Sequence, residues 1–463
     1  MKLLALSTLA IQGAVAFPSL MGKVDEAFQP DKRAAYPAGC SVSKLCNTRM
    51  DISDSEIGYN AKAKTPAQVA SAARNNCGAQ NPTGCTSFNA KAQYVSTSGE
   101  HAYADPAPDE IRGPCPGLNA AANHAYLPRS GIASLPQTVD GMNAAFGMFP
   151  DLSGFLAAYA IVFNGDLLTQ TWSIGGPPPS TTIGSGLLGK PQGISWSHNK
   201  YEGDSSIGRC DAYINGGDAH SLSVERFKYA YVVGMDNDRY TLDKFAREFT
   251  KNSFRSIRQN PNYFAPLFST TLVSPAAYNF VVNLMSNRTA AEPNGYLDGE
   301  IFKTFFGVSG TYPNFKWLPG KERIPENWYR RPSENGYNAV GGVFGDLAAQ
   351  FLAYPVSFRF GGNANGVDTY TGIDIADFTN GAMHLDDLSK PENLACLAYQ
   401  SVQQAVPDFA TGGLLQAATK VLNPALAKAF GGLACPRITK FNNNNLNGYP
   451  GHSYSPTGPA TTC

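Results

Sequence analysis

Cys115 has neighbours that suit it to bind a metal rather than another cysteine. It lies between two prolines, directly before a segment in which apolar residues recur at helical spacing. Because proline suits the first helical position, we expect a helix to begin at Pro116. The sulfur would then face the free N–H groups of Gly117 and Leu118 and the positive end of the helix dipole, both of which stabilise a thiolate. A thiolate of this kind can serve as an axial ligand of haem iron.

The residues around Cys115 resemble a known family. The run DEIRGPCPGLN, from Asp109 to Asn119, continues through Asn123-His124 to the Leu-Pro-Arg at 127–129. It resembles the haem-thiolate peroxidases, which include fungal chloroperoxidases and unspecific peroxygenases. The resemblance implies that Cys115 is the fifth ligand of haem b. Taken alone, such a cysteine would more often be a disulfide partner or an ordinary buried thiol, and the surrounding residues reverse that preference.

A second segment carries the same resemblance. The sequence YEGDSS at 201–206 is similar to the EGD-x-S segment of long peroxygenases rather than to the EHD-x-S of chloroperoxidases. In the family this segment holds a divalent cation against a haem propionate. The resemblance implies that Glu202, the carbonyl of Gly203 and Ser206 bind Mg²⁺, an ion that prefers hard oxygen donors. The upstream run Trp172–Gly176 is also similar to the family.

The cysteines are odd in number. The chain has nine, so at least one thiol stays outside the intramolecular disulfides. Cys396 and Cys435 end two late apolar segments and resemble the C-terminal disulfide of long peroxygenases. With Cys115 assigned to haem, the pairing of the remaining cysteines stays open. They are Cys40, Cys46, Cys77, Cys85, Cys210 and Cys463.

The chain departs from the family on the distal side. Peroxygenases use a distal Glu, with an Arg seven residues upstream, to move a proton between the peroxide oxygens. The corresponding stretch, 274–283, places Asn283 at the Glu position and Ala276 at the Arg position. Asn can hydrogen-bond a peroxide but cannot take its proton, and loss of a general acid–base costs roughly 10²–10⁴ in rate. Three other residues could take the role, and the sequence favours none of them: Glu300, Asp204 and His220.

Apolar periodicity predicts helices around these motifs. Thr241 is expected to cap a helix that ends before Pro261. Further helical patterns cover residues 278–285, 394–402 and 417–430, the last broken at Pro424. Residues 355–375 have the composition of turn-rich loops. We therefore predict a mainly α fold, a single large haem-binding helical domain with long loops and a disulfide-stapled N-terminal extension.

Composition excludes several classes of function. The 36 basic and 36 acidic side chains balance, and neither sign forms a long run. This gives no electrostatic basis for binding nucleic acid or an anionic membrane surface. Beyond the N-terminus no stretch reaches the roughly 18 apolar residues of a membrane span. No protein partner is implied.

The N-terminus has the pattern of a secretory signal peptide. Lys2 precedes a short Leu/Ala-rich run that ends in Ala14-Val15-Ala16; a buried N-terminal helix is the alternative. We expect the protein to be secreted, extracellular, and glycosylated at the Asn287 sequon. The predicted divisions are a signal peptide (1–16), a possible pro-segment (17–35), a cysteine-containing N-terminal extension (36–105), the haem-thiolate peroxidase domain (106–440) and a flexible C-terminal tail (441–463).

Other catalytic motifs lack their context. The run GSGLLGK at 184–190 matches GxGxxG and the start of a P-loop, but Pro191 replaces the hydroxyl residue that would hold magnesium. No CxxC, HExxH or GxSxG occurs. A cysteine hydrolase built on Cys115 and His124 would place the two residues roughly 13 Å apart along one helix, which is too far for a hydrogen bond.

The sequence therefore predicts a haem-thiolate peroxidase or peroxygenase. It would use hydrogen peroxide to oxidise or oxygenate a small organic, aromatic substrate. A haem-binding family member with little or no activity is the alternative, because Asn283 and Ala276 replace the distal pair. A third hypothesis, a disulfide-rich structural protein without a cofactor, predicts no haem absorption. Whether the chain halogenates, peroxidises or oxygenates is left open.

Overall fold

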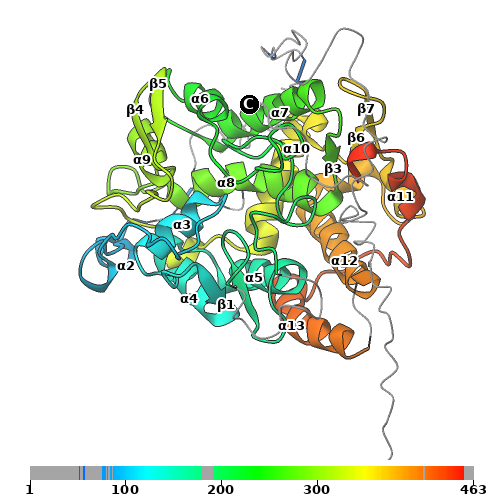
Figure 1. The fold of residues 1–463 in the computed structure, drawn as a ribbon, viewed down its shortest axis with the longest axis horizontal. Helices are drawn as coiled ribbons and strands as arrows, with labels where there is room; N and C mark the ends of the chain where they lie inside the picture. Colours follow the sequence, from blue (N-terminus) through cyan, green and yellow to red (C-terminus); the bar gives the residue numbers. More distant parts are fainter. Residues whose placement is uncertain are drawn as a thin grey trace, which may run out of the picture.

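The computed structural model describes residues 52, 56–57, 76–79, 81, 84–85, 87–179, 191–409 and 412–452. Helices dominate, and the described residues form one domain, as the sequence predicted (Figure 1). The predicted signal peptide and pro-segment, the run at 184–190, and Cys40, Cys46 and Cys463 lie outside the described residues.

The α-helices are α2 (Ala90–Gln93), α3 (Pro116–Asn123), α4 (Leu135–Phe146), α5 (Pro150–Asn164), α6 (Val224–Val232), α7 (Leu242–Gln259), α8 (Ser274–Met285), α9 (Gly299–Phe305), α10 (Gly345–Ala353), α11 (Ile375–Phe378), α12 (Pro391–Phe409) and α13 (Gly412–Phe430). Two segments with wider, π-type turns run directly into α8 and α10: η4 (Leu267–Val273) and η6 (Ala339–Phe344). Single 3₁₀ turns are η3 (Gly99–His101), η5 (Ser333–Asn335), η7 (Pro355–Ser357), η8 (Leu385–Ser389), η9 (Asn443–Leu446) and η10 (Pro450–His452).

Short strands form small antiparallel sheets. One pairs β1 (Ile132–Ser134) with β2 (Thr171–Ser173), another orders β3 (Phe264–Ala265), β6 (Gly361–Asn363) and β7 (Tyr370–Gly372), and a third pairs β4 (Val308–Thr311) with β5 (Asn314–Trp317). The strands β6 and β7 lie within the 355–375 segment, where the composition had indicated only loops.

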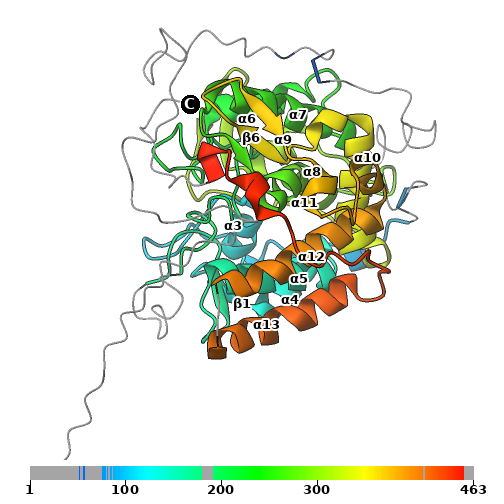
Figure 2. The same ribbon diagram turned by 90° about the vertical axis from the view of Figure 1, so that its right-hand side faces the viewer.

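Helix α5 runs through the middle of the hydrophobic core. Its sequence is apolar on all sides, as expected of a buried helix. It packs against α4 and α13, and Figure 2 shows these helices together below the group that contains α7, α8 and α10. Tyr159 of α5 stacks on Phe268 of η4 with ring centres 4.1 Å apart, while Phe155 meets Phe430 of α13 at 5.0 Å. The first contact joins α5 to the segment that leads into α8, and the second holds α5 against α13.

The predicted helices are largely confirmed, with one correction. Thr241 caps α7 by accepting a hydrogen bond from the N–H of Lys244, and α7 ends at Gln259. Helix α13, in contrast, continues through Pro424, where we predicted a break. Proline removes a backbone donor and normally disrupts a helix interior. Here the apolar side of α13 packs against α5, and this burial offsets the lost hydrogen bond.

The C-terminal segment differs from the prediction. Residues 441–452 were expected to be part of a flexible tail, yet Phe441, Leu446 and His452 are buried. Phe441 packs on Phe378 with ring centres 4.9 Å apart, and η10 lies beside β3 and β6. The run of asparagines suggested a mobile segment, but the apolar residues on either side of it anchor the chain. Residues 453–463 lie outside the described residues.

The disulfides agree with the expectations that can be checked. Cys396 bonds to Cys435, as the resemblance implied, and Cys77 bonds to Cys85 in the N-terminal extension. Cys210 is also disulfide-bonded. Among the described cysteines, only Cys115 is free.

Two surface expectations are informed by the structure. The side-chain nitrogen of Asn287 donates to the hydroxyl of Tyr296 and the carbonyl of Asn327, at 3.2 and 3.4 Å. A glycan on Asn287 would replace one of the two amide hydrogens, so the side-chain nitrogen could keep at most one of these hydrogen bonds.

None of the helices in the described part of the chain combines the length and apolar character that a membrane crossing requires.

Candidate functional site

Cys115 occupies the N-cap position of α3, with Pro116 as the first helical residue, as predicted. The main-chain N–H groups of Gly117 and Leu118 favour its thiolate form, although neither makes a capping hydrogen bond to the sulfur. Burial nevertheless raises the pKa of the thiol, and it outweighs both amides and the positive charge of Arg209. The predicted lowering of this pKa is therefore wrong for the chain alone. A bound metal cation would supply the charge that a thiolate needs in this position.

The loop before α3 is held by buried side chains. Asn119 accepts from the N–H of Gly113 and donates to its carbonyl, both at 2.9 Å, and also donates to Glu322 at 3.1 Å. Arg209 donates to the carbonyl of Pro114 at 2.8 Å. These bonds fix the backbone just before Cys115 and tie it to α3 through Asn119.

Gly113 permits a close approach between this loop and the end of β2. A Cβ atom at Gly113 would lie 2.1 Å from the carbonyl oxygen of Ile174 and 2.6 Å from the Cα of Gly175. Such contacts are too short for any side chain. The run Trp172–Gly176, which resembles the family, therefore packs directly against the backbone of the Cys115 loop.

Cys115 opens onto a large apolar cavity. The cavity encloses about 1170 Å³ of space free of protein atoms, counting its open mouth. Its walls come from the 114–118 loop, α4, α5, the 201–209 segment, η4 and α8. Glu202, Ser206 and Arg209 line the same cavity as Cys115. The structure thus brings together the two segments that carry the sequence resemblance.

The 201–206 segment presents oxygen atoms suited to a cation. The hydroxyl of Ser206 lies 2.7 Å from the carbonyl of Gly203, so one ion can contact both oxygens. Glu202 is buried, and its Oε1 has no hydrogen-bond partner among the described residues. Gly203 lacks a side chain that would otherwise collide with Thr270 of η4. One carboxylate, one carbonyl and one hydroxyl fit a Mg²⁺ that keeps part of its water shell.

His198 places a basic side chain beside this segment. Its Nδ1 lies 2.9 Å from Glu202, and its Nε2 lies 3.9 Å from Asp204. Burial alone would lower the pKa of His198, but the two carboxylates outweigh burial and raise the pKa to about 9. No group of three or more His, Cys, Asp or Glu side chains in the described ranges is arranged to hold a metal. The proposed Mg²⁺ ligands are a mixed set with one carboxylate.

Arg209 fits the acidic edge of a haem. Its guanidinium is buried and lines the cavity, and its Nε has no partner among the described residues. Haem carries two propionates, and an arginine that lines the same cavity as Glu202 and Ser206 supplies a matching charge. The free sulfur, the unpartnered Arg209 donor and the unpartnered Glu202 oxygen together fit haem with a cation at one propionate.

The structure corrects the placement of the distal residues. Asn283 and Ala276 are buried in α8 but do not line the cavity. The cavity side of η4 and α8 consists of apolar residues. They are Val273, Ala277, Phe280, Val281, Leu284 and Met285. Neighbouring residues of a helix point about 100° apart, so an alignment shifted by one residue selects the wrong face.

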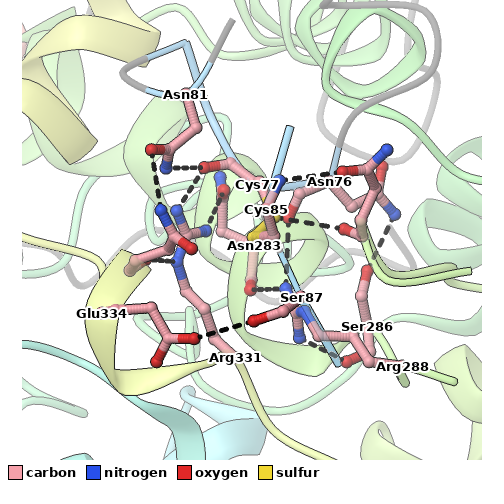
Figure 3. The surroundings of a disulfide bond; sticks show 12 residues. Asn76, Cys77, Asn81, Cys85, Ser87, Asn283, Ser286, Arg288, Arg331 and Glu334 are labelled. Atoms are coloured by element: carbon pink, nitrogen blue, oxygen red, sulfur yellow. Dashed lines mark hydrogen bonds between the residues drawn. A yellow bond between two sulfur atoms is a disulfide. The ribbon is translucent and has the colours of Figure 1, made fainter. Parts of the chain in front are cut away.

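Asn283 instead helps to dock the N-terminal extension. Its side chain accepts from Arg331 at 2.9 Å and donates to Asp346 at 2.8 Å. Arg331 also donates to the carbonyl of Cys77, and Figure 3 shows Asn283 and Arg331 beside the Cys77–Cys85 disulfide. This network lies on the side of α8 that faces away from the cavity.

None of the three substitute acid–base candidates lines the cavity. The side chain of Glu300 is 81% exposed and pairs with Lys303. His220 pairs with Asp218 at 3.1 Å. Asp204 is buried behind Glu202, where the side chain of Asn260 donates to it at 3.2 Å. The cavity therefore contains no carboxylate or histidine from these positions.

Comparison with known proteins identifies the family. A family model described as peroxidase, family 2, matches residues 101–333. This range contains the Cys115 loop, the 201–206 segment and α8. The chain belongs to peroxidase family 2. The resemblance found in the sequence is thereby confirmed, and with it the class of enzyme: a haem peroxidase or peroxygenase, an oxidoreductase that uses peroxide.

Relatives of this peroxidase family 2 member share most of its length. The dothistromin biosynthesis peroxidase dotB of Dothistroma septosporum is 36% identical over 369 residues, which cover 79% of this chain and 87% of the relative. The aromatic peroxidase fscJ of Fusarium equiseti is 34% identical, with coverages of 76% and 82%. The aromatic peroxygenase of Cyclocybe aegerita is 27% identical, with coverages of 67% and 73%.

Two cavity residues had received no role from the sequence. Arg209 and Tyr201 flank the predicted Mg²⁺ ligands along the chain, and both line the cavity. Their nearness to Glu202 was the available signal. Burial raises the pKa of the Tyr201 phenol, so it stays protonated.

Proposed function

We propose that this enzyme uses hydrogen peroxide to oxidise or oxygenate small aromatic substrates, with haem b bound through Cys115. The observation that carries the proposal is the free Cys115 sulfur at the wall of an apolar cavity that also presents Glu202, Ser206 and Arg209. Two relatives are named as aromatic peroxidase and aromatic peroxygenase, which supports the substrate class.

In this proposal each residue has a defined task. Haem supplies the iron chemistry that splits the peroxide O–O bond and oxidises the substrate. Cys115 holds the iron and donates electron density to it, which favours that cleavage. Arg209 neutralises a propionate, while Glu202, the Gly203 carbonyl and Ser206 hold Mg²⁺ beside it. The apolar side of α8 keeps water away from the reacting atoms.

Carbon monoxide distinguishes thiolate ligation from other forms of haem binding. The reduced holoenzyme should show the red-shifted absorption band that thiolate-bound haem gives with this gas. A histidine-type spectrum, or a colourless purified protein from cells supplied with haem, would reject the proposal. Metal analysis of the same sample should find magnesium and iron in equal amounts.

The second candidate is a haem-binding protein with little peroxide turnover. It is favoured by one observation, the apolar side of α8 where an acid–base pair would be expected. Steady-state oxidation of a phenol or a veratryl-type alcohol separates the two functions. Turnover at background level with full haem loading would establish the second candidate.

We also propose that the enzyme is secreted, on the basis of the signal-peptide pattern at residues 1–16. Expression of the full chain in a fungal host should place the protein in the medium. Its N-terminus should lie after Ala16, or after Arg33 if the pro-segment is removed. Retention inside the cell with an intact N-terminus would contradict this proposal.

A further inference from the structure

The hydroxyl groups that line the cavity are almost all committed to main-chain acceptors. Thr138 donates to the carbonyl of Ser134 at 2.8 Å, and Ser153 donates to that of Phe149 at 3.0 Å. Ser206 donates to Gly203. The indole N–H of Trp172 is also used, because it donates to Thr138 at 3.0 Å. These groups have no proton to offer a ligand without breaking a bond.

Tyr201 is the exception. It lines the same cavity, and its hydroxyl makes no hydrogen bond to any residue in the described ranges. Its backbone and its ring are nevertheless held. The N–H of Tyr201 donates to the carbonyl of Ser197 at 3.0 Å, and its ring lies against Tyr159 of α5 with centres 5.5 Å apart. Tyr159 is fixed in turn, since its hydroxyl donates to the carbonyl of Lys200 at 3.0 Å.

The surroundings of Tyr201 restrict what can bind there. The cavity side of α8 is apolar, and Met142, Phe146, Ile194 and Ile207 extend the apolar lining on other sides. A flat aromatic ligand gains most by burying its faces against these walls. Arg209, whose Nε is also unpartnered, is assigned to a haem propionate. Among the other described lining residues, a polar atom on that ligand would lose its water and find a free donor at Tyr201. Ligands with one hydrogen-bond acceptor therefore suit the cavity better than pure hydrocarbons.

We propose that Tyr201 selects aromatic substrates that carry a carbonyl or hydroxyl oxygen by donating a hydrogen bond to that oxygen. This inference rests on the proposed function, because it assumes that the cavity holds the substrate. Tyr201 acts here as a specificity-determining residue through a hydrogen bond, and no proton is transferred. A neutral hydrogen bond of this kind contributes roughly 3- to 10-fold in affinity.

A matched pair of ligands tests the inference without measuring turnover. 2-Acetylnaphthalene and 2-ethylnaphthalene have nearly the same shape, but only the first carries an acceptor. Their dissociation constants are measured by calorimetry on the ferric holoenzyme and on Tyr201→Phe. The wild type should bind the acetyl compound about 3- to 10-fold more tightly than the ethyl compound. Tyr201→Phe should reduce this ratio to about 1 by weakening only the acetyl compound.

The control variant is Ser153→Ala, which removes a cavity hydroxyl that is already bonded to the protein. It should leave the acetyl-to-ethyl ratio as it is in the wild type. An unchanged ratio in Tyr201→Phe, or an equal loss for both ligands, would overturn the inference.

The absorption spectrum of each calorimetry sample keeps the two proposals separate. A protein that shows no haem band contradicts the proposed function, whatever the ligand ratio. A haem-loaded protein whose ratio does not respond to Tyr201→Phe contradicts only the role of Tyr201. Calorimetry detects ligand binding with or without haem, so each sample tests the inference.

Discussion

On one side of the cavity, buried polar side chains fix the loop that carries Cys115, with Asn119 bonded to both main-chain groups of Gly113 and Arg209 bonded to Pro114. Along another wall of the cavity, α8 presents only apolar side chains, and its polar residue Asn283 turns outward to Arg331 and Asp346. Both sides are well packed. They differ in whether their polar groups are directed at the cavity.

This difference separates two abilities that are often treated as one. Holding a cofactor requires a fixed ligand and compensating charges, and the Cys115 side provides them. Cleaving peroxide quickly requires in addition a group that moves a proton, typically worth roughly 10²–10⁴ in rate. The α8 side contains no such group. Binding of haem is therefore the more strongly supported property, and the rate of peroxide turnover is where variants should reveal most.

The largest effect is expected from Cys115→Ala. Loss of the sulfur should abolish the carbon-monoxide band of thiolate-bound haem and reduce peroxide-dependent turnover to background, because no other free cysteine lies in the described residues. The measurements are a difference spectrum and an assay on a phenol. A thiolate-type spectrum that survives this substitution would show that Cys115 is not the ligand of the haem iron.

The next largest effect is expected from adding an acid–base side chain to the cavity side of α8. Ala277→Glu places a carboxyl group on the cavity side of α8, where burial in apolar surroundings should raise its pKa towards neutrality. Peroxide-dependent turnover should rise by roughly 10²-fold, at the lower end of the range for a general acid–base. Asn283→Glu is the matched control and should give no gain, because position 283 faces the N-terminal extension. Equal gains from both variants would invalidate the assignment of the two faces.

A smaller effect is expected at the acidic edge of the cavity. Glu202→Gln removes the carboxylate proposed to bind Mg²⁺ and should weaken magnesium binding by about 10- to 100-fold. Haem should then be lost faster on dialysis, and a chelator should have the same effect on the wild type. The control is Glu225→Gln, which changes an exposed carboxylate on α6. This variant should retain magnesium and haem as the wild type does. Identical retention in the two variants would argue against the Mg²⁺ site.

The smallest change in turnover is expected from Asn283→Ala. This variant removes one hydrogen bond each from the buried side chains of Arg331 and Asp346, which should lower the free energy of unfolding by about 1–3 kcal/mol. Turnover of the folded enzyme should stay within about twofold, since the side chain does not reach the cavity. Denaturant unfolding provides the measurement. Gln403→Ala, which breaks an exposed hydrogen bond to Tyr399, should change stability by less than about 0.5 kcal/mol. A large loss of turnover at unchanged stability would support the original prediction that Asn283 lies at the distal site.

The features that the sequence predicted correctly are local ones. Cys115 at the start of a helix, the cap at Thr241 and the pairing of Cys396 with Cys435 each depend on nearby residues or on a family pattern. Which residues of α8 point into the cavity depends on η4, because its wider turns add residues to the helix before α8 begins. Each added residue rotates the remainder of the helix by about 100°. Nothing in the sequence of η4 marks that change, so the alignment selected Asn283 rather than its cavity-facing neighbours.

Packing between distant segments was also beyond the sequence. Pro424 is tolerated because α13 lies on α5, and the raised pKa of the half-buried Cys115 thiol reflects walls contributed by several helices. Asn283 could be understood only once Cys77, Arg331 and Asp346 were seen together (Figure 3). These contacts join residues that lie far apart along the chain.

The last described residues bear on when the protein can acquire its cofactor. The carbonyl of Gly451 accepts a hydrogen bond at 3.1 Å from Asn199, in the turn that leads to Glu202. A nascent chain cannot make this contact until Gly451 has emerged from the ribosome. The turn before Glu202 gains this support only when the 450–452 segment has docked, so truncations before Gly451 should reduce cofactor loading although they lie far from Glu202 in the sequence.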